Sequence, residues 1–179
     1  MKRLITMFLI IGVAMFFYSC SENNSTAPEL SQSNQVINIL AKEKIQFEGI
    51  CTFVAPGVGG DTTFLPNGKI LVKGYTTVWH DATNDPRVTG NTYWYVNQKI
   101  EEDGTFKYWG KAVLIVDGGL GKWEMSWHGD LTYTAEGPML VANAVGQGKE
   151  GDVKGLVAEW TYTMDFALSQ YNIVGHIKE

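Results

Sequence analysis

The chain has 179 residues, and 14 Lys and Arg stand against 19 Asp and Glu, which gives a formal net charge of -5. This acidic balance argues against a nucleic-acid-binding protein, because such proteins gather basic side chains against the phosphate backbone. A hydrophobic content of 45%, with 12% aromatic residues, excludes an intrinsically disordered chain, and the length suits one domain.

The first residues have the three-part layout of a secretory signal. Lys2 and Arg3 precede an apolar run over residues 4–18, and an abruptly polar segment begins at Ser21. The run is short for a membrane span, which needs about 17–25 residues. We therefore interpret residues 1–19 as a signal peptide and exclude them from the fold.

The apolar run ends in Phe17-Tyr18-Ser19-Cys20, which resembles the lipobox of bacterial lipoproteins. In that family the cysteine thiol is acylated and the cysteine becomes the new N-terminus, so the resemblance implies a lipid on Cys20. The alternatives are an ordinary cleaved signal with an incidental cysteine, or a weak membrane anchor. The resemblance predicts a lipoprotein of the bacterial cell envelope, anchored to a membrane, most simply the periplasmic or surface face of the outer membrane.

A flexible tether is expected over residues 20–44. Its part from 21 to 35 is rich in Ser, Asn and Gln and carries almost no large apolar side chain. Only Cys20 and Cys51 are cysteines, so a lipid on Cys20 leaves Cys51 without a partner in the chain. We interpret Cys51 as a small buried side chain, and a reactive thiol remains the alternative.

Residues 45–179 show the two-residue alternation of β-strands rather than a helical period. In the clearest stretch, Trp123, Met125 and Trp127 fall on one face and polar side chains on the other. Eight strands are predicted, at Ile45–Val54, Lys69–His80, Thr92–Ile100, Phe106–Val116, Lys122–Leu131, Met139–Gly148, Leu156–Phe166 and Tyr171–Lys178. Gly, Asn and Asp between them are turn residues, and Asp85 and Arg87 are expected to hold one turn by local hydrogen bonds.

Long strands joined by short turns, with no helix between them, predict an antiparallel meander that closes on itself. Closure removes the exposed edges that an open sheet would have. The predicted fold is all-β, a single antiparallel eight-stranded up-and-down β-barrel over residues 45–179. A β-sandwich is the structural alternative.

Several motifs in this region resemble a known group of proteins. They are Asp85-Pro86-Arg87-Val88-Thr89-Gly90, Gly121-Lys122-Trp123-Glu124-Met125-Ser126-Trp127-His128-Gly129, Gly146-Gln147-Gly148-Lys149-Glu150-Gly151 with Lys154-Gly155-Leu156, and Gly175-His176-Ile177. Together they are similar to a group of bacterial barrel proteins, which resembles in shape the calycin-like barrels of allene oxide cyclase and the dirigent proteins. The resemblance implies a fold. It implies no activity, because the cyclase's catalytic residues cannot be matched to positions of this chain.

No catalytic, metal or cofactor motif emerges from the sequence. The three histidines fall in three different predicted strands, and His128 and His176 lie on polar faces, which does not favour a zinc site. The letters Gly146-x-Gly148-x-x-Gly151 match a dinucleotide fingerprint, but the helix that such a site needs does not follow them. No catalytic residue, metal or cofactor is therefore predicted.

The aromatic residues suggest a binding site inside the barrel. An eight-stranded barrel has room for packed side chains or for one small ligand. The predicted lining residues are Cys51, Tyr108, Trp127, Trp160 and Tyr162. The outward rings of Tyr95 and Trp109 could seat a partner, so a homo-oligomer also remains open.

Three functions stay in competition. The first is a non-enzymatic module that binds a small apolar or amphipathic molecule in the barrel mouth. The second is an isomerase or cyclase acting on a hydrophobic substrate, with Tyr or Glu in the pocket wall. The third is an interaction protein with a filled barrel.

Overall fold

A computed structural model of the chain describes residues 43–179. The predicted signal peptide, the lipidation of Cys20 and nearly all of the predicted tether therefore lie outside the described residues. None of the helices between residues 43 and 179 has the length and apolar character that a membrane crossing requires.

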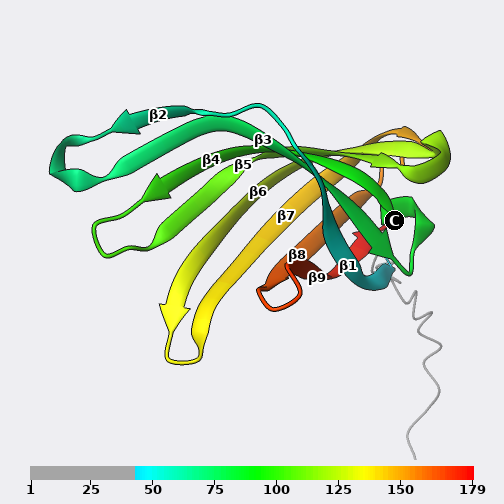
Figure 1. The fold of residues 1–179 in the computed structure, drawn as a ribbon. Helices are drawn as coiled ribbons and strands as arrows, with labels where there is room; N and C mark the ends of the chain where they lie inside the picture. The colour runs from blue at the N-terminus through cyan, green and yellow to red at the C-terminus, as the bar shows by residue number, and fades with distance from the viewer. Residues whose placement is uncertain (1–42) are drawn as a thin grey trace, which may run out of the picture. The chain divides into compact units, whose positions relative to one another are not determined.

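The described residues form one antiparallel sheet (Figure 1). Its strands are β1 (Lys44–Pro56), β2 (Asp61–Phe64), β3 (Ile70–Thr83), β4 (Gly90–Ile100), β5 (Phe106–Val116), β6 (Gly121–Thr134), β7 (Gly137–Gly151), β8 (Val157–Asp165) and β9 (Gln170–Lys178). Three short 3-10 turns, η1 (Pro66–Gly68), η2 (Pro86–Val88) and η3 (Asp117–Gly119), lie in the connections. All eight predicted strands are present, with ends that differ by a few residues.

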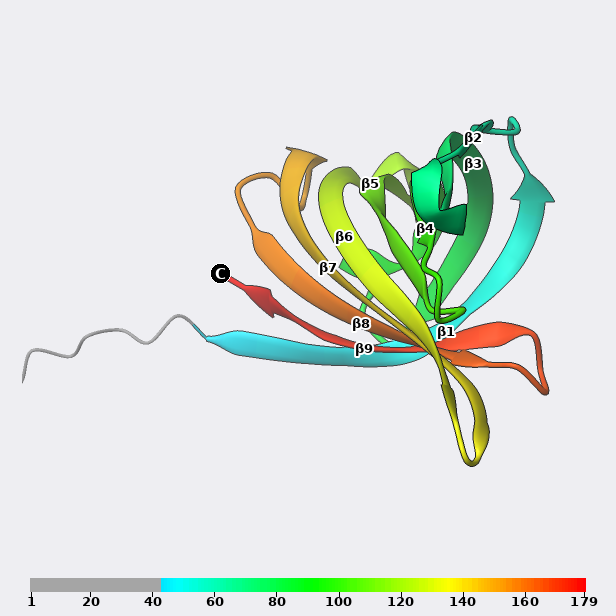
Figure 2. The same cartoon turned by 90° about the vertical axis from the view of Figure 1, so that its left-hand side faces the viewer.

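β1 closes the sheet into a barrel because it pairs along both of its edges (Figure 2). Its first part, Lys44 to Thr52, pairs with β9, and its second part, from Gly49 to Pro56, pairs with β3. The register shifts between Phe53 and Ala55. The predicted all-β, eight-stranded antiparallel barrel is thus confirmed, and the sandwich alternative is wrong.

β2 was not predicted. All four of its residues are exposed, and it pairs only with the first part of β3, outside the closed ring. A strand that buries neither face has no alternation of polar and apolar residues, so the period that revealed the other strands is absent here.

The barrel has one closed end, which holds most of the packed core. Trp123, Val88 and Val153 are fully buried there, so the turn η2 and the β7–β8 connection act as a plug. The Nε1 of Trp123 donates to the carbonyl oxygen of Arg87 at 2.7 Å, which joins the barrel wall to this plug. The Trp160 ring packs edge-on against Trp123, with ring centroids 5.4 Å apart.

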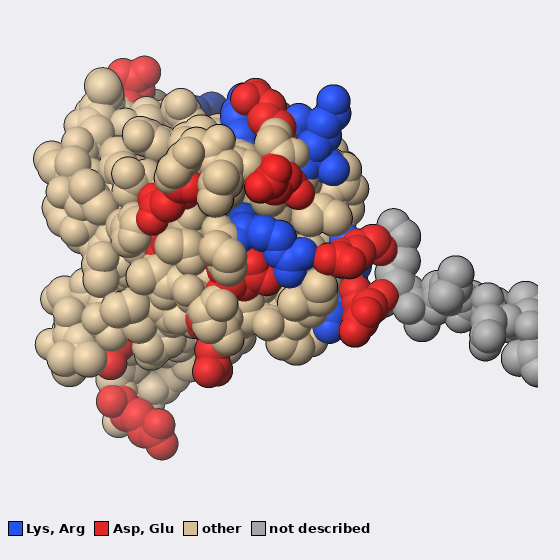
Figure 3. Space-filling model, turned by 90° about the vertical axis from the view of Figure 1, so that its right-hand side faces the viewer, with Lys and Arg blue, Asp and Glu red and all other residues tan. Residues whose placement is uncertain are grey.

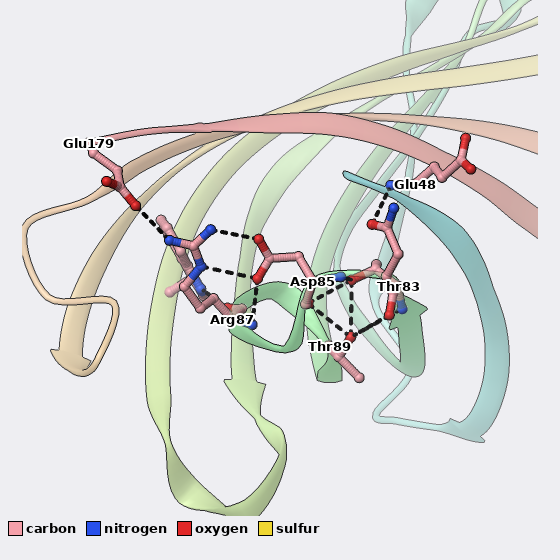
Figure 4. Close-up of polar contacts among 8 residues, drawn as sticks. Glu48, Thr83, Asp85, Arg87, Thr89 and Glu179 are labelled. Carbon is pink, nitrogen blue, oxygen red and sulfur yellow. Dashed lines mark hydrogen bonds and ion pairs between the residues drawn. The ribbon is translucent and has the colours of Figure 1, made fainter. Parts of the chain in front are cut away.

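An ion-pair network fixes the turn of this plug (Figure 4). The Asp85 carboxylate accepts from the backbone nitrogen of Arg87 at 3.0 Å and from its Nη2 at 2.7 Å. Arg87 Nη1 donates to Glu179 Oε1 at 2.8 Å, which links the turn to the C-terminus. These bonds with Arg87 lower the pKa of Asp85. Basic and acidic side chains lie side by side on this face (Figure 3), and the predicted local role of Asp85 and Arg87 is confirmed.

The packing at the closed end predicts a large loss of stability for Trp123→Ala. The substitution removes a fully buried ring and leaves the Arg87 carbonyl without its donor, so the free energy of unfolding should fall by about 3–5 kcal/mol. Urea unfolding followed by circular dichroism measures the loss. Trp109→Ala, on the outer face, is the matched control and should cost much less. Equal losses would show that the closed end does not hold the barrel together.

Candidate functional site

A cavity of about 210 Å³ lies inside the barrel, towards the end that carries the β4–β5, β6–β7 and β8–β9 hairpins, which we call the mouth. Its wall is formed by Cys51, Tyr75, Thr77, Trp79, Trp94, Val96, Tyr108, Trp127, Leu140, Ala142, Tyr162 and Tyr171. The volume exceeds the roughly 150 Å³ in which an apolar protein cavity binds benzene. It is smaller than the roughly 300 Å³ at which drug-sized sites begin.

The alternation along the strands creates this wall. Tyr75, Thr77 and Trp79 are successive inward positions of β3, and the next inward position is Asp81. On the other side of the barrel, β7 contributes Leu140 and the small Ala142 to the wall, and Ala142 pairs with Gly129 of β6. Large rings on one side therefore face small residues on the other, and the space between them stays open.

The rings of the wall pack edge to face in a continuous chain. Trp94 lies at right angles to Trp127 and to Tyr162, with ring centroids 4.9 Å and 5.1 Å apart. Tyr162 in turn packs against Tyr171, and Tyr171 packs against Trp79 at 5.0 Å. Aromatic pairs favour this geometry, so the rings support each other and hold the wall in place without a ligand.

The structure brings four of the five predicted lining residues together. Cys51, Tyr108, Trp127 and Tyr162 lie in the cavity wall, and that they bind a ligand remains a prediction. Trp160 is a correction: it points into the barrel but is fully packed towards the closed end, outside the wall. The alternation of polar and apolar residues identifies which side chains of a strand point into the barrel. Whether such a side chain borders the cavity or is packed below it depends on the stagger between neighbouring strands.

The most informative residue that the sequence analysis missed is Asp81. It is completely buried, although a buried carboxyl group is rare and costly. The predicted strand ended at His80, three residues before β3 ends at Thr83, so Asp81 was not considered as an inward position. Continuing the alternation from Tyr75 through Trp79 by one more step would have found it.

Asp81 lies directly behind the cavity wall. Its Oδ2 accepts from Thr92 Oγ1 at 2.8 Å and from Tyr162 Oη at 3.0 Å. Cys51 is its partner across the β1–β3 pairing, and the thiol also faces the carboxyl group. No N–H or O–H group of the described residues reaches Oδ1. Tyr162 and Cys51 therefore lie between this carboxyl group and the cavity.

Burial raises the pKa of Asp81 to about 6, and the hydrogen bonds from Cys51, Thr92 and Tyr162 offset only part of this effect. The same burial, together with the nearby carboxylate of Asp81, raises the pKa of the Cys51 thiol well above its ordinary value. Cys51 is thus a buried free thiol, as predicted, and its thiolate is disfavoured. The cluster offers a carboxyl group that changes its charge near neutral pH, not a nucleophilic cysteine.

No family model matches the chain, and no curated protein and no solved structure matches it either. The closed eight-stranded barrel is therefore known from its own strand pairing, and the calycin-like family resemblance remains a prediction.

The buried carboxyl group predicts that Asp81→Asn stabilises the protein at high pH. An unfolded Asp ionises near its ordinary pKa of 3.8, whereas the folded one ionises near 6. The unfolded state therefore releases its proton first, and the stability of the wild type falls as the pH rises from about 4 to 6. The Asn oxygen can still accept from Thr92 and Tyr162. Above pH 7 the variant should exceed the wild type by up to about 3 kcal/mol.

Urea unfolding of both proteins at a series of pH values between 4 and 8 measures this difference. The exposed substitution Asp130→Asn serves as the control and should leave the pH profile of stability nearly unchanged. A constant difference between Asp81→Asn and the wild type over the whole range would contradict the shifted pKa of Asp81.

Proposed function

We propose that this protein is a lipid-anchored bacterial envelope protein whose barrel binds a small apolar or amphipathic molecule without transforming it. The observation that carries the proposal is the cavity of about 210 Å³ at the barrel mouth, lined mainly by aromatic and aliphatic side chains. Burial of apolar ligand surface contributes about 25 cal/mol per Å² to the free energy of binding, so such a wall favours a hydrophobic ligand.

The character of the wall supports binding over simple packing. Ligand sites are mostly apolar surfaces with a few well-placed polar groups, and here the hydroxyl groups of Tyr75, Tyr108, Tyr171 and Thr77 are those groups. A filled barrel would leave no such volume. The proposal of an interaction protein is therefore less well supported, although Tyr95 and Trp109 are exposed outside the barrel, at 50% and 38%, and could contact a partner or a second copy.

The lipid anchor of this proposal rests on the sequence of residues 1–20 alone. The chain enters the barrel at Lys44, which is at the closed end because it pairs with Lys178, the last residue of β9. A lipid on Cys20 would thus be connected to the barrel at the end opposite the mouth. The proposed likeness to the calycin-like barrels concerns shape and assigns no reaction.

A second candidate is an isomerase, and Asp81 is the observation that favours it. Enzymes retain buried carboxyl groups with raised pKa values as general acids or bases, in spite of their cost in stability. Asp81 is 0% exposed and contacts the cavity only through Tyr162 and Cys51. Proton transfer to a substrate would have to pass through the Tyr162 hydroxyl group.

The binding proposal predicts that a small molecule co-purifies with the protein and that Ala142→Leu removes it. The larger side chain would extend into the cavity from β7, opposite the large rings. Native mass spectrometry followed by solvent extraction measures occupancy. Val145→Leu, on the outer face of the same strand, is the control and should retain the molecule.

Repeated absence of any molecule from the wild type, with no uptake of small aromatic probes, would contradict the binding proposal. Conversion of an extracted molecule into an isomer of equal mass, seen by chromatography after incubation with the protein, would favour the second candidate instead.

The anchor proposal predicts that Cys20→Ala releases the protein from membranes, because the acylated thiol is lost. Fractionation of cells followed by immunoblotting measures the distribution. Cys51→Ala should stay in the membrane fraction, since Cys51 is buried in the barrel and carries no lipid in this proposal. Membrane retention of Cys20→Ala would contradict lipid anchoring at this residue.

A further inference from the structure

The polar groups of the cavity wall fall into two sets. The first set is already bonded within the protein: Trp79 Nε1 donates to Thr77 Oγ1, Trp127 Nε1 to the carbonyl oxygen of Lys111, and Tyr162 Oη to Asp81. These groups hold the wall in its conformation. They are not free to donate to a guest molecule.

The second set consists of three phenol groups, those of Tyr75, Tyr108 and Tyr171. All three side chains line the cavity and are half-buried, and no hydrogen bond joins their hydroxyl groups to another of the residues 43–179. They come from β3, β5 and β9, so they reach the cavity from different sides of the barrel. Hydroxyl groups without a protein partner at a binding surface are the groups that a ligand can use.

These three hydroxyl groups act as hydrogen-bond donors. Burial is the main cause that raises the pKa of all three phenols, and it raises the pKa of Tyr75 to about 12. The phenols therefore keep their protons at any physiological pH, and all three side chains line the same cavity.

The wall carries no Lys, Arg, Asp or Glu among its residues. A charged ligand would enter an apolar space without a counter-ion, and desolvation of an unpaired charge is costly. An anion would in addition lie near the Asp81 carboxyl group behind Tyr162. The wall thus disfavours carboxylates and amines and accommodates a neutral acceptor.

We infer that the cavity takes a neutral, single-ring aromatic molecule that carries a carbonyl oxygen. Its ring packs against Trp94, Trp127 and the small side chain of Ala142, and its oxygen accepts hydrogen bonds from two of the three phenols of Tyr75, Tyr108 and Tyr171. The volume of about 210 Å³ fits one substituted ring. This inference rests on the proposed binding function and specifies its ligand class.

Isothermal titration calorimetry on the mature protein with two probes of similar shape tests the inference. Acetophenone has the ring and the carbonyl oxygen, and ethylbenzene has the ring alone. Each of Tyr75→Phe, Tyr108→Phe and Tyr171→Phe removes one donor with little change in shape. At least two of them should weaken acetophenone binding about fivefold, the effect of one lost hydrogen bond, and leave ethylbenzene binding within twofold of the wild type.

Tyr95→Phe, on the outer face of β4, is the matched control and should change neither probe. Benzoate, which has nearly the same size but a negative charge, should bind more weakly than acetophenone.

The possible failures are distinguishable. If both probes bind the wild type and none of the three inner substitutions affects acetophenone more than Tyr95→Phe does, the carbonyl inference is overturned and the binding function stands. Tighter binding of benzoate than of acetophenone overturns the preference for a neutral ligand. If neither acetophenone nor ethylbenzene binds the wild type although a molecule co-purifies with it, the inference is overturned and the binding function stands. If no molecule co-purifies either, both fail.

Discussion

The pairing of β1 with both β9 and β3 is the constraint on which the remaining structure depends. Without it, the sheet would be an open, twisted layer with two unpaired edges and no interior. With it, the inward side chains of eight strands converge, so that rings distant in the sequence, such as Trp94 and Tyr162, come into contact. The β1–β3 pairing also places Cys51 opposite Asp81. The contact between this thiol and the buried carboxyl group therefore exists only because the barrel closes there.

The closed ring is packed unevenly along its axis, with a filled end and an end that holds a cavity. At the closed end, Trp123 and Trp160 meet beneath the turn that contains Arg87, and the interior is filled. Towards the mouth, Ala142 and Gly129 face large rings and leave room. A small barrel needs a packed core to be stable, and here one half of the interior provides that core while the other half keeps an open cavity.

Asp81 lies between these two halves and is costly to the fold. Its carboxyl group is fully buried, receives two hydroxyl donors on one oxygen and has no N–H or O–H partner on the other among the described residues. A well-packed apolar residue would stabilise the barrel more, because burial disfavours the charged form. Buried ionisable groups that cost stability in this way are concentrated at functional sites. Asp81 is joined to the cavity by its hydrogen bond with Tyr162, which lies in the wall.

The sequence by itself determined the eight strands of the barrel and most of their inward positions, because burial of one sheet face imposes a two-residue period that residues such as Trp123, Met125 and Trp127 display directly. It also supplied the candidate lining residues Cys51, Tyr108 and Tyr162, since each lies on an inward face. Only the tertiary structure decided which inward residues border a space: Trp160 is packed against Trp123, whereas Tyr75 and Tyr171 face the cavity. The physical reason is that alternation is a local property of a strand, whereas depth and free volume depend on strand stagger and on which small and large side chains meet across the barrel.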